Sequence, residues 1–226
     1  MSAAQPAPTS TQAPSSARPP VTLGQTTHLD PGAYVRGTHG ITLGEQTLVH
    51  PRAQLVAVHG PLSIGDRCII SEKCVIGGPV ATDKPSEGPE GAGRGAGGSG
   101  SDESDPVKTT IHSRVYVHAN AHVLAGAVIK EAVVIEPHVT VRAGVTVGSH
   151  AKICAGVTVD RDVDDWAVVY GNGDLKRQRR RKRDQSETEH AELVETMRLK
   201  AMDKEREGTM AILKMAARTA TLAKKK

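Results

Sequence analysis

Aliphatic residues recur at every sixth position over most of this chain. Nine such positions between 111 and 159 are in phase: Ile111, Val117, Val123, Ile129, Ile135, Val141, Val147, Ile153 and Val159. A period of six does not fit an α-helix, because successive repeats would drift by about 240° around a helix of 3.6 residues per turn. Short strands separated by turns do fit it, with the aliphatic side chain of each strand pointing inward.

The same phase continues upstream in three groups of three hexads, at Leu23, Leu29, Val35, then Leu43, Val49, Leu55, then Ile64, Ile70, Ile76. It slips by two residues after Val35, by three after Leu55 and by 29 after Ile76. Each slip follows a complete group of three. The pattern therefore predicts a three-sided β-solenoid of six turns, in which all three excursions leave at the same corner and these last three residues lie on a common wall.

The composition agrees with a narrow aliphatic interior. Of 226 residues, 38% are hydrophobic, but there are three Tyr, one Trp and no Phe, so binding sites built from stacked aromatic rings are not expected. No stretch approaches the ~20 apolar residues of a bilayer span, and the Pro- and Ser-rich start does not resemble a signal peptide. Three cysteines outside any CxxC arrangement favour a reduced, intracellular protein.

Composition also divides the chain. We expect a disordered tail over 1–20, a solenoid over 21–171 with a flexible inserted loop at 78–110, a basic linker over 172–184 and a helical segment over 185–226. The part before residue 174 has a net charge of −3 and the rest +7. The basic run at 176–183 fits either a solvated linker, which we favour, or a nucleic-acid or nuclear-import element.

The C-terminal segment is rich in good helix formers. Leu193, Met197 and Ala201 fall at helical spacing, which predicts a helix that packs along one face of the solenoid. Gly208 is expected to break or kink it.

Two hexads, 43–48 and 64–69, have the form aliphatic–Gly–x–x–small–x. They resemble the repeats of left-handed parallel β-helix proteins. The expected fold is therefore all-β: a left-handed parallel β-helix of about six three-sided coils, plus a C-terminal α-helix. The left-handedness is implied by the resemblance, since the spacing does not determine it.

Solenoids of this kind resemble two groups of enzymes. Carbonic-anhydrase-like members need three metal-binding imidazoles, but this chain has Ala119 and Leu124 at two of those positions. His118 and His122 lie nearby but out of register, and we interpret them as surface residues.

Acyltransferase-like members need a catalytic histidine and usually a proline in the closing segment, where this chain has Gly173. His50, His59, His138 and His150 are candidates for a base only because they are histidines. We therefore expect no catalytic residues, no metal site and no cofactor, and a protein that is not an enzyme. The alternative is a hexapeptide-repeat enzyme, either a metal hydratase or a coenzyme-A-dependent acyltransferase.

Three segments resemble the dynactin subunit 6 family more than its sister, subunit 5: residues 48–53, residues 60–66 and the exit at 169–177. The resemblance implies a non-catalytic structural subunit of the dynactin pointed-end complex, which supports dynein-dependent microtubule transport in the cytoplasm and cytoskeleton. The implied partners are the subunit 5 solenoid, subunit 4 and the pointed-end actin-related protein. No membrane insertion and no nucleic acid are expected.

We place the partner contact on the corner where the excursions leave the coil, and on the basic run. The candidate residues are His39, His59, Pro61, Gly78, Pro79, Lys176, Arg177, Arg179 and Arg180. The alternative is that corners of a solenoid simply tolerate insertions at little cost.

Overall fold

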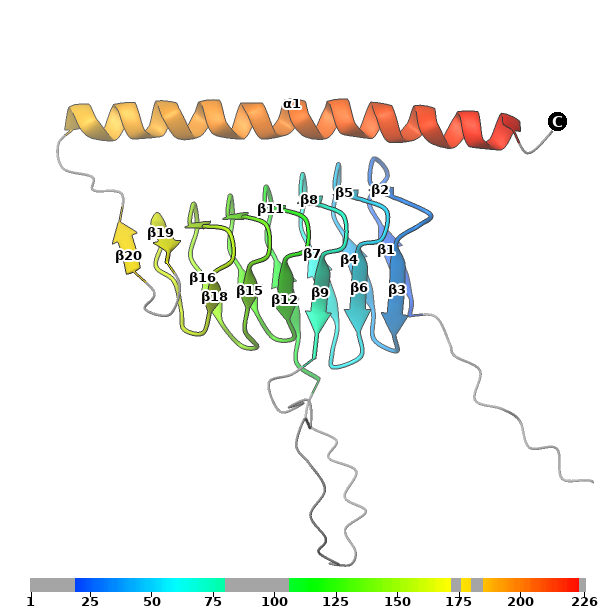
Figure 1. Ribbon diagram of the computed structural model, residues 1–226, viewed down its shortest axis with the longest axis horizontal. Helices are drawn as coiled ribbons and strands as arrows, with labels where there is room; N and C mark the ends of the chain where they lie inside the picture. Colours follow the sequence, from blue (N-terminus) through cyan, green and yellow to red (C-terminus); the bar gives the residue numbers. More distant parts are fainter. Residues whose placement is uncertain (1–18, 80–105, 172–175, 180–184, 224–226) are drawn as a thin grey trace, which may run out of the picture.

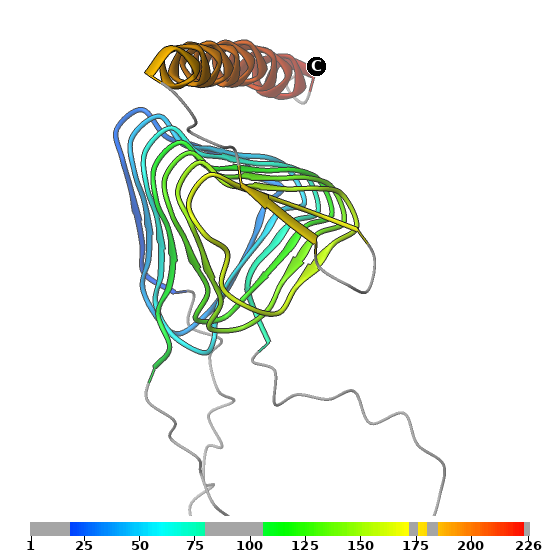
Figure 2. The ribbon, with the colours of Figure 1, turned by 90° about the vertical axis from the view of Figure 1, so that its left-hand side faces the viewer.

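The protein is a three-sided parallel β-solenoid with one long helix lying along it (Figures 1 and 2). The computed structural model describes residues 19–79, 106–171, 176–179 and 185–223. The expected disorder of the N-terminal tail and flexibility of the inserted loop therefore fall almost wholly outside the described residues. In the part of the chain that is described, no helix is both long and apolar enough to cross a bilayer.

Each coil contributes one short strand to each of three sheets. The first sheet contains β1 (Val21–Leu23), β4 (Ile41–Leu43), β7 (Leu62–Ile64), β10 (Thr109–Ile111), β13 (Val128–Ile129) and β16 (Thr146–Val147). The second contains β2 (His28–Leu29), β5 (Leu48–Val49), β8 (Ile69–Ile70), β11 (Tyr116–Val117), β14 (Val134–Ile135), β17 (Lys152–Ile153), β19 (Ala167–Tyr170) and β20 (Lys176–Arg179). The third contains β3 (Tyr34–Gly37), β6 (Gln54–Ala57), β9 (Val75–Gly78), β12 (His122–Leu124), β15 (Thr140–Val141) and β18 (Thr158–Val159).

The strand register confirms the six-turn solenoid. Val35 pairs with Leu55, and Leu55 with Ile76, so the three residues that precede the phase slips share one wall. All three excursions connect the third sheet to the first, at the corner farthest from the helix (Figure 2). The parallel ladders and the triangular cross-section are consistent with a left-handed β-helix of hexapeptide repeats.

The interior is a column of aliphatic side chains. From the second coil onward the inward-facing residues are almost fully buried, for example Ile70, Val117 and Ile153 at 0% exposure. Cys68 and Cys74 occupy inward positions in the same column. The hexad period thus places a small or branched side chain inside at every strand, as the sequence predicts.

One uninterrupted helix, α1 (Gln185–Ala223), covers the outer face of the second sheet (Figure 1). It runs against the order of the coils, since its first half contacts the sixth coil through His150 and its second half contacts the second coil through Gln46. The expected break at Gly208 is wrong. The glycine lies in open space within a run of good helix formers, so its cost of about 1 kcal/mol is too small to interrupt the helix.

A second difference concerns the segment expected to be a basic linker. Within it, Lys176–Arg179 form β20, which pairs antiparallel with β19 at the end of the second sheet. The other strand pairs among the described residues are parallel, so β20 ends the parallel stacking of the second sheet. A sequence rich in Lys and Arg is compatible with a strand at the edge of a sheet.

Candidate functional site

The first coil carries inward-facing apolar residues that no earlier coil covers among the described residues. Val21 and Leu23 are 37% and 46% exposed, whereas their neighbours one coil later, Ile41 and Leu43, are at most 1% exposed. Strands β1, β2 and β3 each pair on one side only among the described residues. A hollow of about 410 Å³ opens at this end, lined by Pro19, Val21, Leu29, Pro31, Ala33, Tyr34 and Val35. The first coil therefore exposes apolar side chains next to unpaired backbone groups at the strand edges. Both features are typical of a surface that binds another protein.

The corner that we expected to bind a partner is built mainly from contacts between coils. The Nδ1 atom of His39 lies 3.1 Å from the carbonyl oxygen of Ala57, and the main-chain oxygens of His59 and Pro61 accept hydrogen bonds from Val107 and Thr109. Gly78 is buried and Pro79 is exposed. The structure thus brings these residues to one corner, and their role in binding a partner stays a prediction.

The basic candidates lie elsewhere. Lys176, Arg177 and Arg179 belong to β20, next to the last coil and far from this corner, and Arg180 lies outside the described residues. The structure therefore does not join the two groups of candidate residues into one surface.

Ion pairs attach the first half of α1 to the solenoid. Glu195 is 3% exposed, and its Oε1 atom lies 2.7 Å from Nδ1 of His150. Arg198 binds the same carboxylate and donates a hydrogen bond of 2.6 Å to the carbonyl oxygen of Ala132. Burial raises the pKa of Glu195, but the hydrogen bonds from Arg198 and His150 outweigh it and hold the pKa below its ordinary value.

The second half of α1 is attached in the same way. Arg206 is 4% exposed, donates to the carbonyl oxygen of Gln46 and pairs with Asp203, which also lies 3.8 Å from Arg67. Gln46 and Arg67 have positive φ values of 56° and occupy equivalent turns of neighbouring coils. Arginine and glutamate on a helix usually predict a solvated face, so sequence reasoning did not single out Glu195 or Arg206.

A polar cluster lies beside the helix, at the corner between the second and third sheets. The hydroxyl of Tyr116 donates a 2.5 Å hydrogen bond to Glu205, and its ring stacks on that of His118 at 3.9 Å. Burial, together with Glu205, raises the pKa of Tyr116 to about 12. Burial lowers the pKa of His118, so this imidazole is neutral near pH 7.

The neighbouring coils place other polar groups at the same corner position as His118. The strand register puts Ser71 one coil before it and Glu136 one coil after it. Glu136 pairs with Lys152 at 2.8 Å, and this hydrogen bond lowers the pKa of Glu136. A neutral imidazole between a hydroxyl and a carboxylate can accept a proton. The aliphatic side chains inside the solenoid cannot.

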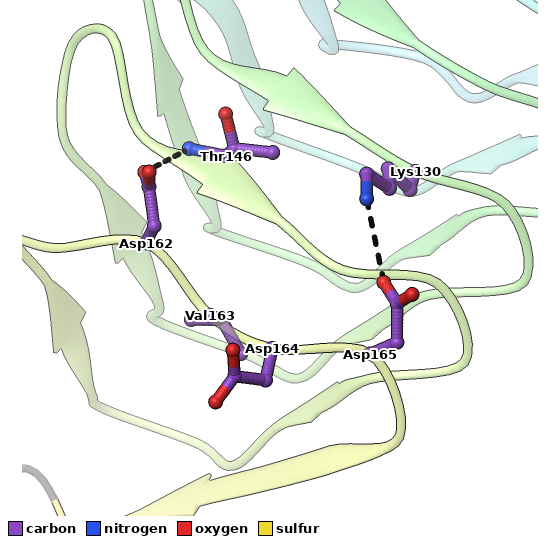
Figure 3. Close-up of a pocket in the computed structure, with 6 residues that line it drawn as sticks. All are labelled: Lys130, Thr146, Asp162, Val163, Asp164 and Asp165. Atoms are coloured by element: carbon purple, nitrogen blue, oxygen red, sulfur yellow. Dashed lines mark hydrogen bonds and ion pairs between the residues drawn. The ribbon is translucent and has the colours of Figure 1, made fainter.

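An acidic hollow of about 520 Å³ lies on the first sheet near the last coil (Figure 3). Two of its three carboxylates accept hydrogen bonds from backbone amides. Asp162 accepts a 2.8 Å hydrogen bond from the amide of Thr146, and Asp165 accepts one of 2.8 Å from the amide of Ser149 and pairs with Lys130. The hydrogen bond from the amide of Ser149 lowers the pKa of Asp165 below its ordinary value, and Lys130 lowers it further. Slight burial of the carboxylate opposes this shift. Asp162 and Asp165 thus satisfy backbone amides of the sixth coil.

The histidines considered as metal ligands are separated by the fold. His118 lies at the corner described above, and His122 is exposed on the third sheet. Among the described residues, no three His, Cys, Asp or Glu side chains lie together in a way that could hold a metal ion.

Comparison with known proteins agrees with the repeats. The family model described as bacterial transferase hexapeptide (six repeats) matches residues 108–143 and 126–161. Dynactin subunit 6 of the sea anemone Nematostella vectensis is 37% identical over 49 residues, which are 22% of this chain and 27% of that protein. The match thus spans about a quarter of this relative.

Solved structures share the fold at low sequence identity. A Bacillus cereus protein assigned as an acetyltransferase has a TM-score of 0.55 and 14% identity, over 83% of this chain and 92% of its own. A hexapeptide transferase family protein of Anaplasma phagocytophilum has a TM-score of 0.41 and 12% identity, over 86% and 91%. An acetyltransferase of Vibrio cholerae, solved with acetyl coenzyme A, has a TM-score of 0.41 and 16% identity, over 70% and 69%. At such identity the first of these shows the fold alone.

These matches overturn the expectation that the chain is not an enzyme. The matching repeat model is described as that of bacterial transferases, and the Bacillus cereus protein that shares the solenoid is assigned as an acetyltransferase. The expectation rested on Ala119, Leu124 and Gly173, which stand where the two enzyme groups have their motif residues. These departures do not exclude chemistry, because the outer corners of the coils carry other polar groups such as His118 and Glu136.

The hexad phase, the three parallel sheets and the family match over residues 108–161 lead to one conclusion. The chain folds as a parallel β-solenoid built from hexapeptide repeats.

Proposed function

We propose that this protein is an assembly subunit that binds other proteins through the open end of its first coil, as a relative of dynactin subunit 6. The observation that carries the proposal is the exposure of Val21 and Leu23, which face inward and pair only with the second coil within the described part of the chain. A partner that covers this end would bury apolar surface and pair the free edges of β1, β2 and β3.

The partial similarity to dynactin subunit 6 supports the choice of partner. On this proposal the chain works in the cytoplasm with the cytoskeleton, beside the other pointed-end subunits of dynactin: subunit 5, subunit 4 and the pointed-end actin-related protein. The excursion corner and the basic residues of β20 are secondary candidates for the contact.

The test uses two neighbouring residues of β1 that face opposite ways. Leu23→Lys puts a charge into the exposed interior of the first coil, and Thr22→Lys puts the same charge on the exposed outer face. Full-length tagged chains are purified from their own cells, and co-purifying pointed-end subunits are quantified by mass spectrometry. We expect Leu23→Lys to lose them and Thr22→Lys to retain them. Equal recovery with both variants would contradict the proposal.

A second candidate function, acyl transfer from a coenzyme A thioester, is favoured by the polar corner at His118. The neutral imidazole would take the proton of an acceptor hydroxyl or amine as the acceptor oxygen or nitrogen attacks the thioester carbonyl carbon. The carbon–sulfur bond then breaks, and the departing thiolate takes the proton back from the imidazole. The acetyltransferases that share the fold support the class of reaction.

This activity is tested by measuring release of free coenzyme A thiol from acetyl coenzyme A with a panel of hydroxyl and amine acceptors. We expect His118→Asn to abolish turnover and His122→Asn, on the neighbouring exposed strand, to leave it unchanged. No acetyl-dependent turnover with any acceptor would remove this candidate. Leu23→Lys should not affect it, which keeps the two proposals separable.

A further inference from the structure

The side of α1 that faces away from the solenoid carries a row of mostly apolar or small residues. The row consists of Val194, Met197, Ala201, Lys204, Gly208, Ala211 and Met215, all of them exposed. Their steps alternate between three and four residues, which is the spacing of a coiled-coil seam. The opposite side of the helix, which includes Glu195, Met202 and Arg206, is the one buried against the solenoid.

The sequence predicts that Leu193 and Met197 pack against the solenoid, and the structure places them outside, 53% and 59% exposed. The helix is held to the solenoid by ion pairs and by Met202, so the outward row is not needed for docking. An exposed row of mostly apolar or small residues at regular heptad spacing over more than five helical turns is typical of a surface that pairs with another helix.

The middle of this row is narrow. Ala201, Gly208 and Ala211 have small side chains or none, and the space where a Cβ atom of Gly208 would lie is empty to at least 4 Å. A second helix can therefore approach closely at this point, which increases its contact area.

The charges of the row determine which helix fits. Lys204 lies within the row, and its Nζ atom is 3.4 Å from Glu207 on the next turn. If two copies of α1 pair in the same direction, Lys204 meets Lys204 of the other copy, which is repulsive. If they pair antiparallel about a twofold axis, Lys204 lies over Gly208 of the second copy and reaches its Glu207, and the reverse contact repeats by symmetry.

The same antiparallel register places Ala201 opposite Ala211 and Met197 opposite Met215. It also leaves the two solenoids on opposite sides of the helix pair, because α1 lies outside its own solenoid (Figure 2). We propose that this protein forms a twofold-symmetric dimer in which the outward rows of two α1 helices pair antiparallel. The proposal does not rest on the function proposed above.

The first test measures the mass of the full chain in solution by sedimentation equilibrium across a concentration series. We expect the mass to rise from 23.8 kDa toward twice that value. Met197→Glu places a charge in the row and should raise the dimer dissociation constant by at least about tenfold. Thr196→Glu adds the same charge at the adjacent exposed position outside the row and should leave it unchanged.

The second test determines the direction of pairing by oxidative cross-linking of variants that carry one introduced cysteine on α1, with Cys154 replaced by Ala and the buried Cys68 and Cys74 left in place. We expect a mixture of Ala201→Cys and Ala211→Cys chains to form a covalent dimer, and either variant alone to form none.

Three outcomes would overturn the proposal. They are a monomeric wild-type chain at every concentration, cross-linking of Ala201→Cys chains with one another, and equal dissociation constants for the two glutamate variants. A monomeric chain whose α1 binds a helix of a different protein belongs to the first of these.

Discussion

Side chains inside the coils must be small or branched, and two of these positions hold cysteines. Burial raises the pKa of the Cys68 and Cys74 thiols to about 12. Their sulfur atoms lie 3.0 Å and 2.9 Å from the carbonyl oxygens of His112 and His118 on the following coil. Both thiols are therefore protonated and enclosed, and they act as compact fillers of the column.

This enclosure predicts which cysteine reacts. At pH 8 the native protein treated with iodoacetamide should be alkylated at Cys154, which is partly exposed, and not at Cys68 or Cys74. Peptide mass spectrometry measures the modification of each. In denaturant all three should react, which is the control. Rapid native modification of Cys68 or Cys74 would show that the second-to-fourth coils open readily.

The sequence predicts which residues lie inside the coils, but it does not predict which residues of α1 contact the solenoid. The period of six assigns Val35, Leu55 and Ile76 to one wall because a strand fixes which residues face inward. Glu195 and Arg206 are buried because they bind His150 and the carbonyl oxygen of Gln46, which lie in distant turns of the solenoid. A local sequence pattern does not encode such long-range contacts. The proximity of His118 to Ser71 and Glu136 likewise depends on how the coils stack, since the three residues come from three successive coils.

Among the elements, α1 differs most from its sequence-based interpretation. Helical spacing predicted the element, but it did not identify the docked side, because apolar residues occur on both sides of the helix. The helix binds the solenoid chiefly through Glu195, Arg198 and Arg206, whose desolvation is compensated by paired charges and carbonyl oxygens. The stability of this helix–solenoid contact therefore depends on whether Glu195 is ionised.

We expect docking of the first half of α1 to weaken in acid. The carboxyl of Glu195 has a lowered pKa in the folded protein, so its contribution is complete above its ordinary value of 4.5 and is lost as the pH falls through the lower folded value. Trp166, the only tryptophan, stacks at 4.2 Å on His150, the partner of Glu195. A change in its fluorescence below pH 4.5 reports the loss.

Glu195→Gln should shift the tryptophan signal at neutral pH and remove most of this acid transition. Glu192→Gln, at an exposed position one turn earlier, is the matched control and should preserve it. An unchanged transition in Glu195→Gln would assign the titration to another group.

Gly208 gives a second prediction for the helix. Because nothing of the same chain lies within 4 Å of the added methyl group, Gly208→Ala should raise the free energy of unfolding of the helix by about 1 kcal/mol at concentrations where the chain is monomeric. Helix content measured by circular dichroism during thermal unfolding of dilute protein tests this. A loss of helix stability in the dilute protein would contradict the prediction.

In the whole molecule, each coil rests on its neighbours, so stability varies along the axis. Ile70 in the third coil is fully buried, whereas Leu29 in the first is only partly buried. Ile70→Ala should cost about 2–5 kcal/mol and Leu29→Ala less than about 2 kcal/mol. Chemical denaturation monitored by circular dichroism compares them. Equal losses would imply that the first coil is as well packed as the interior ones.

The six-turn architecture followed from the positions of the phase slips, since loops can leave a triangular coil only at its corners. The capping strand β20 did not follow, because four basic-rich residues carry no strand signal of their own. Its pairing depends on the free edge of β19, which exists only once the last coil has formed.

The antiparallel strand β20 also has a consequence for polymerisation. A solenoid whose two ends both offered parallel edges could add further copies head to tail, and such growth does not close. On the second sheet the last edge is occupied by a strand of the opposite direction, so an incoming first coil meets a mismatched ladder there. The antiparallel strand therefore disfavours head-to-tail growth at this end of the second sheet.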